Sequence, residues 1–183
     1  MDQHQDQDQN SQPVPFPNSF WVIPEKFLAG EYPGDLEPQR AQRKLANMLQ
    51  LGINVFIDLT HPEDSLLSYH SIAQEVASEF GVEVEIYASP IEDFSTPMPL
   101  EMKTILDKID QALAEEKRVY VHCLGGIGRT GTVVGCYLVR HGLEGEAAIR
   151  RLNELRRSTP KSWYQAPESD EQRRMILEWR AGG

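Results

Sequence analysis

The segment from Val119 to Thr130 constrains this chain more than any other part of it. A short apolar run ends in the pair His122-Cys123, a glycine-rich stretch follows, and Arg129-Thr130 opens an apolar segment with helical spacing. A strand that leads through a glycine-rich loop into the first turn of a helix makes backbone N–H groups converge on one point. The segment therefore predicts an oxyanion-binding loop with a thiol at its entrance and a guanidinium at its far end.

Cys123 and Arg129 stand in the pattern Cys-x5-Arg. The thiolate is the nucleophilic form of cysteine, and a helix N-terminus and a neighbouring cation both favour it. We expect Arg129 to grip two phosphoryl oxygens in a bidentate fork, His122 to fix the loop through its ring nitrogens, and Thr130 to donate its hydroxyl to Cys123. The loop amides, with glycines that permit tight curvature, are expected to cradle the phosphoryl oxygens together with Arg129. These amides belong to Leu124, Gly125, Gly126, Ile127 and Gly128.

Hydrophobic periodicity predicts strands that alternate with helices along the chain. Strands are expected at 20–23, 27–29, 53–59, 82–88 and 118–122, the first two forming a hairpin. Helices are expected at 37–50, 65–80, 100–116, 129–140, 144–157 and 167–179, with a proline-rich loop at 89–99. The alternation predicts a single α/β domain with a central mixed or parallel sheet of about four to five strands and helices on both faces.

The first 17 residues are dominated by Gln, Asp and Pro, and they cannot bury enough apolar surface to order themselves. We therefore expect a disordered tail over residues 1–17 and one folded catalytic domain over residues 18–183. Neither a repeat nor a second domain is predicted.

Composition predicts a soluble cytoplasmic protein without a membrane partner. The chain is 40% hydrophobic and 25% charged, which is typical of globular proteins. Its apolar runs fall short of the ~18 residues of a membrane span, and its N-terminus lacks the basic and apolar regions of a secretory signal. Two cysteines, Cys123 and Cys136, are too few for a disulfide scaffold and fit a reducing compartment. We expect Cys136 to be a small core residue.

The net charge of −10 argues against a nucleic-acid partner, because contacts to a phosphate backbone require patches of Lys and Arg. The charge is uneven: residues 1–118 carry 8 Lys/Arg against 21 Asp/Glu, whereas residues 119–183 carry 10 against 7. The basic portion contains the anion-binding loop, where it would attract an anionic substrate. The alternative is that these arginines simply form the solvated faces of two C-terminal helices.

The motif His122-Cys123-x5-Arg129-Thr130 resembles the signature of cysteine-dependent protein tyrosine phosphatases, particularly the small, atypical dual-specificity type. Residues 91–97, Ile-Glu-Asp-Phe-Ser-Thr-Pro, resemble the general-acid loop of that family, and residues 29–34 and 58–60 resemble the entry region of bacterial and archaeal members. The resemblance covers residues 18–180. It implies a protein tyrosine phosphatase-like fold, hydrolysis through a cysteinyl-phosphate intermediate, and no cofactor or metal.

The same resemblance implies that Asp93 is the general acid and then the general base of the reaction. Glu92 and Asp58 are the alternatives, although Asp58 fits a role in anchoring a loop better; Asp93 itself could instead be a turn residue that caps its loop. Gln172 resembles a glutamine that positions the hydrolytic water in some family members. The competing interpretation is an ordinary glutamine on an exposed helix.

The expected partner is a phosphorylated protein or peptide. The variable loop positions Leu124, Gly126 and Ile127 include no lysine, whereas lipid-phosphate members of the superfamily resemble this loop but carry basic residues there. The short entry region favours dual specificity, with phosphotyrosine accepted beside phosphoserine and phosphothreonine. The alternatives are a phosphatase of phosphoinositides or other small phosphomonoesters, a non-catalytic phospho-binding module, and a sulfurtransferase or arsenate reductase. The oligomeric state and the physiological substrate are left open.

Overall fold

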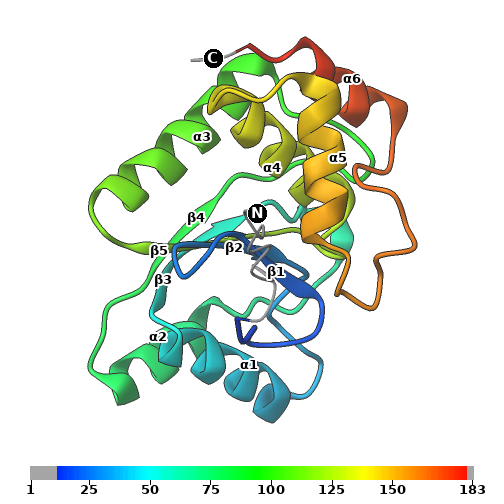
Figure 1. The fold of residues 1–183 in the computed structure, drawn as a ribbon. Helices are drawn as coiled ribbons and strands as arrows, with labels where there is room; N and C mark the ends of the chain where they lie inside the picture. Colours follow the sequence, from blue (N-terminus) through cyan, green and yellow to red (C-terminus); the bar gives the residue numbers. More distant parts are fainter. Residues whose placement is uncertain (1–11, 181–183) are drawn as a thin grey trace, which may run out of the picture.

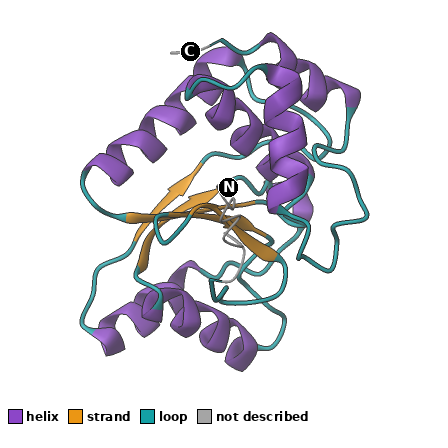
Figure 2. Cartoon of the chain, viewed as in Figure 1, coloured by secondary structure: helices purple, strands orange, loops and turns teal. Residues whose placement is uncertain are grey.

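The computed structural model describes residues 12–180 and shows one sheet between two layers of helices (Figures 1 and 2). The strands are β1 (Ser19–Ile23), β2 (Phe27–Gly30), β3 (Ile53–Asp58), β4 (Glu85–Ala88) and β5 (Arg118–His122). The helices are α1 (Pro38–Gln50), α2 (His70–Phe80), α3 (Pro99–Ala114), α4 (Gly128–Arg140), α5 (Gly145–Leu155) and α6 (Asp170–Glu178), with a 3-10 turn at Pro62–Asp64. Among the described residues, no helix is long and apolar enough to cross a membrane.

The five strands lie in the order β1-β2-β5-β3-β4. β1 is antiparallel to β2, and the remaining pairs are parallel, so the sheet is mixed. β5 is therefore central, and its last residue, His122, is in register with Gly30 of β2 and Asp58 of β3. The carboxyl ends of three parallel strands thus meet where Cys123 follows β5, which is where open α/β sheets bind ligands.

The sheet separates two hydrophobic cores, because successive residues of a strand point to opposite faces. Val119 and Val121 of β5 belong to the core beneath α3, α4, α5 and α6, whereas Tyr120 belongs to the core beneath α1 and α2. His122 also lies on the α1/α2 side, where its ring contacts the ring of Tyr69. Four consecutive residues of β5, 119–122, thus contribute to both cores, and this strand leads into the Cys-x5-Arg loop.

The predicted α/β sheet and its helices are confirmed, but the predicted helix at 65–80 is wrong in its first turn. The helix α2 begins only at His70, after Tyr69. Ser65 takes a left-handed conformation with φ 54°, which ends the 3-10 turn before it and prevents a continuous helix. Tyr69 is buried in the core although it lies in a loop. Its spacing from the apolar residues of α2 therefore matches that of a helix without Tyr69 being helical. The strand predicted at 82–88 shortens to β4, and the helix predicted at 167–179 shortens to α6.

The end of the predicted disordered tail packs against the domain. Phe16 is buried, and its ring meets Tyr120 edge-on at a centroid distance of 6.0 Å. The carbonyl of Pro15 accepts a hydrogen bond from Asn47 at 3.2 Å, and the carbonyl of Pro13 accepts one from the indole of Trp21 at 3.1 Å. Residues 13–16 of this segment therefore lie against the domain, because one aromatic side chain in a polar segment suffices to anchor it. Residues 1–11 lie outside the described residues.

We expect Phe16→Ala to lower the free energy of unfolding by about 3 kcal/mol, because it removes a buried aromatic ring and leaves a cavity over Tyr120. Urea denaturation measures this change. The matched control is Val14→Ala, since the Val14 side chain is 38% exposed. Equal effects of the two substitutions would contradict the anchoring role of Phe16.

Candidate active site

The loop after β5 curls around the thiol of Cys123. Cys123 is 3% exposed, and its Sγ accepts a hydrogen bond from the backbone N–H of Gly126 at 3.3 Å. Gly126 has φ +72°, and a Cβ built there would lie 2.5 Å from the carbonyl carbon of Gly30 and 2.7 Å from the backbone nitrogen of Glu31. Only glycine fits both the left-handed conformation and this close approach. The loop thus packs directly against the backbone at the end of β2.

The ring of His122 contacts the start of this loop. Its Nδ1 lies 3.4 Å from the carbonyl oxygen of Cys123, and its Nε2 lies 2.9 Å from the hydroxyl of Tyr69. A carbonyl only accepts, so the contact to Cys123 places the proton on Nδ1, and Nε2 then accepts from Tyr69. Burial lowers the pKa of His122 to about 4, although the nearby charge of Asp58 opposes the shift. His122 is therefore a neutral ring near neutral pH.

Asp58 is one of the two alternatives considered for the general acid, and its carboxylate is fully engaged in anchoring. It accepts from the amide and the hydroxyl of Thr60, at 2.9 and 2.6 Å, and from Nε2 of His70 at 3.1 Å. Burial opposes ionisation of Asp58, but His122, which is protonated only at low pH, and the bonds from Thr60 and His70 outweigh burial and lower the pKa of Asp58. A carboxyl group held in its ionised form by these partners suits a structural role.

Arg129 lies in the first turn of α4, and its guanidinium is held from three sides. It forms a two-pronged bond to the carboxylate of Asp64, at 2.7 and 3.3 Å, and donates to the carbonyl of Ile91 at 2.9 Å. Its Nη2 also lies 3.2 Å from Oδ1 of Asp93. Burial disfavours the charged guanidinium, but Asp64, Cys123 and Asp93 outweigh burial and raise the pKa of Arg129. The cation therefore stays charged although the residue is only 2% exposed.

Asp64 contacts Arg129 in the site, and sequence reasoning missed it. It ends the 3-10 turn after β3, where its carboxylate also accepts from the backbone N–H of His61 at 2.9 Å. Burial opposes ionisation, yet the bonds from Arg129 and His61 lower the pKa of Asp64. The available signal was the run His61-Pro62-Glu63-Asp64 directly after a buried strand, which places an acid at the same sheet edge as the Cys-x5-Arg loop.

Asp93 lies at the mouth of the site. Its side chain is 48% exposed and pairs with Arg129, and its Oδ1 accepts from the N–H of Phe94 at 3.1 Å. Asp93 is thus both the turn residue that the alternative predicted and the exposed carboxylate next to the loop. Within residues 12–180, the neighbouring Glu92 forms no ion pair with Arg129, whose carboxylate partners are Asp64 and Asp93.

Glu168 brings a further carboxylate to the loop, and sequence reasoning did not find it. It accepts from the backbone N–H of Gly128, and a Cβ at Gly128 would lie 2.5 Å from its Oε2. Burial, together with the charge of Asp93, raises the pKa of Glu168. A negative group at the N-terminus of α4 is favoured by the helix dipole. No local pattern marks Glu168, because it reaches the loop from the long connection between α5 and α6.

Two predicted contacts differ in the structure. The hydroxyl of Thr130 donates to the carbonyl of Gly30 at 3.5 Å and not to Cys123, because the end of β2 lies against the loop. Gln172 is fully buried, and its Oε1 accepts from the N–H groups of Glu168 and Ser169, both at 3.1 Å. Gln172 therefore does not lie on an exposed face, and its amide oxygen is already occupied by the cap of α6.

The remaining loop residues divide into outer and inner positions. Leu124 is 42% exposed and points to the rim, whereas Ile127 is buried in the core beneath α4. Cys136 lies inside α4, where burial raises the pKa of its thiol, so it is an inert core residue. Within residues 12–180, no cluster of three or more His, Cys, Asp or Glu side chains could hold a metal ion.

A buried thiol that accepts a loop N–H, a guanidinium held by Asp64 and the exposed carboxylate of Asp93 lie together at the loop after β5, which is the arrangement that the resemblance to phosphatases implies. Comparison with known proteins agrees. The sequence profile described as "Polymorphic toxin system, DSP-PTPase phosphatase" matches residues 33–143. The chain belongs to this family, and it is a small, atypical member of the dual-specificity branch of the protein tyrosine phosphatase superfamily.

Curated relatives match over part of their length. An uncharacterized protein of Methanocaldococcus jannaschii is 30% identical over 101 residues, which is 55% of this chain and 58% of that protein. The human dual specificity protein phosphatase CDC14C is 43% identical over 49 residues, which is 27% of this chain and 10% of that protein. The chain thus spans less than two thirds of these relatives.

Solved structures share the fold. Tk-PTP in its active form superposes with a TM-score of 0.70 at 24% identity, covering 90% of this chain and 97% of that one. PTPMT1 in complex with PI(5)P superposes with a TM-score of 0.66 at 17% identity, covering 88% of this chain and 94% of that one. The predicted protein tyrosine phosphatase-like fold is confirmed.

We expect Asp64→Ala to lower kcat/KM for p-nitrophenyl phosphate by about 10- to 100-fold, because Arg129 loses its two-pronged partner and its fixed orientation. Steady-state kinetics measure the loss, and thermal unfolding shows whether the variant is folded. Glu63→Gln, a change at the preceding residue, is the matched control and should retain wild-type activity. Unchanged kinetics in Asp64→Ala would refute the orienting role.

His122 predicts a specific pH dependence of stability. Its pKa in the folded protein is about 4 and its ordinary value is 6.5, so between these values the unfolded chain binds a proton that the folded protein does not. Stability is therefore complete above the ordinary value and falls as pH drops towards the folded value. We expect the loss from this residue between pH 7 and pH 5 to be about 2 kcal/mol.

Urea denaturation at the two pH values, with His122→Asn for comparison, isolates this contribution. Where the variant is too unstable to measure, the ring resonances of His122 in the native protein serve instead. A native His122 that titrates near pH 6.5 would contradict the assignment of a neutral buried ring.

Proposed function

We propose that this protein hydrolyses phosphotyrosine, and phosphoserine or phosphothreonine with it, in protein or peptide substrates through a cysteinyl-phosphate intermediate. The observation that carries the proposal is the placement of Arg129. Its guanidinium is oriented by Asp64 on one side and pairs with Asp93 on the other, while the thiol of Cys123 accepts a loop N–H. Nucleophile, anion-binding group and acid candidate therefore converge on one loop.

In the first step, the thiolate of Cys123 attacks phosphorus, and the bond from phosphorus to the ester oxygen breaks. Asp93 gives its proton to the departing oxygen, while the loop amides and Arg129 stabilise the equatorial oxygens. In the second step, water attacks phosphorus and gives its proton to Asp93, and the phosphorus–sulfur bond breaks. The thiolate departs, and inorganic phosphate is released.

The surface beside the loop supports a protein substrate over a phosphoinositide. A depression of about 380 Å³ adjoins Leu124, and its exposed apolar side chains include Leu36 and Leu67. The two lysines that line it are both neutralised, Lys161 by Glu31 at 3.0 Å and Lys44 by Asp35 at 3.8 Å. An inositol headgroup with several phosphates requires unpaired cations, whereas a peptide side chain next to a phosphorylated residue fits an apolar hollow.

We infer that the protein acts in a reducing compartment, the cytoplasm. Its cysteines Cys123 and Cys136 are both free, and the proposed chemistry requires Cys123 as a thiolate. Phosphorylated proteins are its proposed partners.

Release of inorganic phosphate from matched phosphotyrosine, phosphoserine and phosphothreonine peptides tests the proposal, with dispersed phosphatidylinositol phosphates in parallel. We expect Cys123→Ser to abolish release and Asp93→Asn to lower kcat by about 10²- to 10⁴-fold without weakening inhibition by vanadate. The control variant is Glu92→Gln, which should keep wild-type turnover.

Three outcomes would contradict the proposal. Turnover by Cys123→Ser would exclude the covalent intermediate, and an unchanged rate in Asp93→Asn would move the acid role to another carboxylate. Hydrolysis of phosphatidylinositol phosphates but not of peptides would assign the site to lipid substrates. Phosphopeptide binding without any turnover would identify a phospho-binding module.

A further inference from the structure

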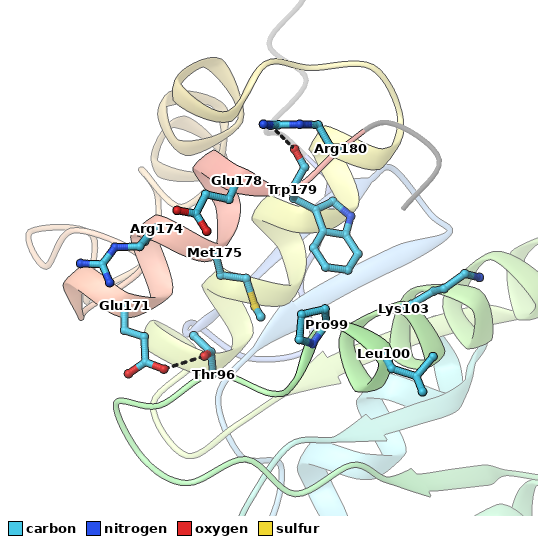
Figure 3. A pocket seen from close by; sticks show the side chains of 10 residues that line it. All are labelled: Thr96, Pro99, Leu100, Lys103, Glu171, Arg174, Met175, Glu178, Trp179 and Arg180. Atoms are coloured by element: carbon cyan, nitrogen blue, oxygen red, sulfur yellow. Dashed lines mark hydrogen bonds between the residues drawn. The ribbon is translucent and has the colours of Figure 1, made fainter.

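The loop that carries Asp93, residues 89–98, is bonded from behind to the N-terminus of α6. Three consecutive loop residues take part, and each bond goes to a different residue of the helix cap (Figure 3 shows the outermost one). The bonds run from Ser169 Oγ to the Phe94 carbonyl (2.8 Å), from Gln172 Nε2 to the Ser95 carbonyl (3.1 Å), and from Thr96 Oγ1 to Glu171 Oε1 (2.8 Å).

The cap of α6 is itself rigid. Ser169 accepts from the N–H of Gln172 at 3.2 Å, and Gln172 Oε1 accepts from the N–H of Ser169 at 3.1 Å, which is a reciprocal capping box. Gln172 is fully buried, so its orientation is set by packing. The side chains of Ser169 and Gln172 are therefore held in place by contacts within the cap, independently of their bonds to the loop.

The loop needs such external bonds. Phe94 has φ +59°, a left-handed conformation that costs a residue with a Cβ about 1–2 kcal/mol. Its side chain is 57% exposed and contributes little packing. The bonded carbonyls of Phe94 and Ser95 directly follow Asp93, so holding them fixes the backbone from which the Asp93 carboxylate reaches Arg129.

The outer bond of this set lies at the edge of a groove between α3 and α6. The groove has a volume of about 640 Å³, and Figure 3 shows Met175 of α6 and Trp179, which directly follows α6, facing Pro99 of α3, with Thr96 and Glu171 at one end. The bond between Thr96 and Glu171 is exposed, so it can be removed without disturbing the core.

We propose that Ser169, Glu171 and Gln172 are positioning residues that hold the loop of residues 89–98 closed, so that Asp93 stands beside Arg129 before substrate binds. This inference rests on the proposed function, in which Asp93 is the general acid. It assigns to Gln172 a role in placing the acid, through Ser95, that is distinct from positioning the hydrolytic water.

The inference has a chemical signature. When the acid is in place, it protonates the departing oxygen, and the rate depends little on how basic that oxygen is. When the acid is displaced, esters with a basic leaving group slow down strongly, whereas esters with an acidic leaving group do not. Phenyl phosphate and p-nitrophenyl phosphate provide this contrast. General destabilisation of the fold would slow both esters equally.

The test variant is the double substitution Thr96→Val/Ser169→Asp. Valine has the shape of threonine without its donor, and aspartate caps a helix as well as serine does but cannot donate to the Phe94 carbonyl. The matched control is Glu178→Gln, which changes another residue that lines the groove and forms no bond to the loop in residues 12–180. Asp93→Asn is measured in parallel.

We expect the double variant to lose about tenfold in kcat for phenyl phosphate and less than about twofold for p-nitrophenyl phosphate, with unchanged inhibition by vanadate. The control should match the wild type on both esters. An unchanged ratio between the two esters in the double variant, beside a changed ratio in Asp93→Asn, would overturn the positioning role and leave the proposed function intact. An unchanged ratio in Asp93→Asn would instead overturn the acid assignment and the positioning role with it.

Discussion

The geometry of this site depends on one buried cation. Arg129 is 2% exposed, and its charge is balanced by the carboxylates of Asp64 and Asp93. Removing a charge from water is costly unless partners of opposite sign and good geometry surround it. These partners come from the segments after β3 and β4, and Arg129 itself follows β5, so the guanidinium draws three loops together at one edge of the sheet. The register of those strands, which aligns Asp58 with His122, brings the loops within reach.

Much of the fold and the centre of the site could be predicted from sequence, because the signals are local. A strand, a glycine-rich loop and a helix start occupy twelve consecutive residues, from Val119 to Thr130, and the spacing of Cys123 and Arg129 is visible in them. The alternation of strands and helices likewise follows from periodicity within short windows. Asp93 was found only because a resemblance pointed to its loop.

The remainder depends on contacts between distant segments. Asp64 binds Arg129 across 65 residues of sequence, and no spacing rule connects the two. Periodicity placed Tyr69 in a helix, but Tyr69 is buried from a loop, because Ser65 is left-handed. Phe16 anchors a segment whose composition predicted disorder. In each case the deciding contact or conformation is not visible in the local sequence pattern.

The close packing of Gly126 against the backbone of Gly30 and Glu31 has a consequence for biosynthesis. β2 and β5 are neighbours in the sheet but lie about ninety residues apart, so their pairing is a contact of long sequence separation. The N-terminal hairpin leaves the ribosome long before the strand that it must pair with. The anion-binding loop therefore gains its contact with Gly30 and Glu31 only when β2 pairs with β5. A chain that contains the Cys-x5-Arg motif but lacks the N-terminal hairpin does not form the complete site.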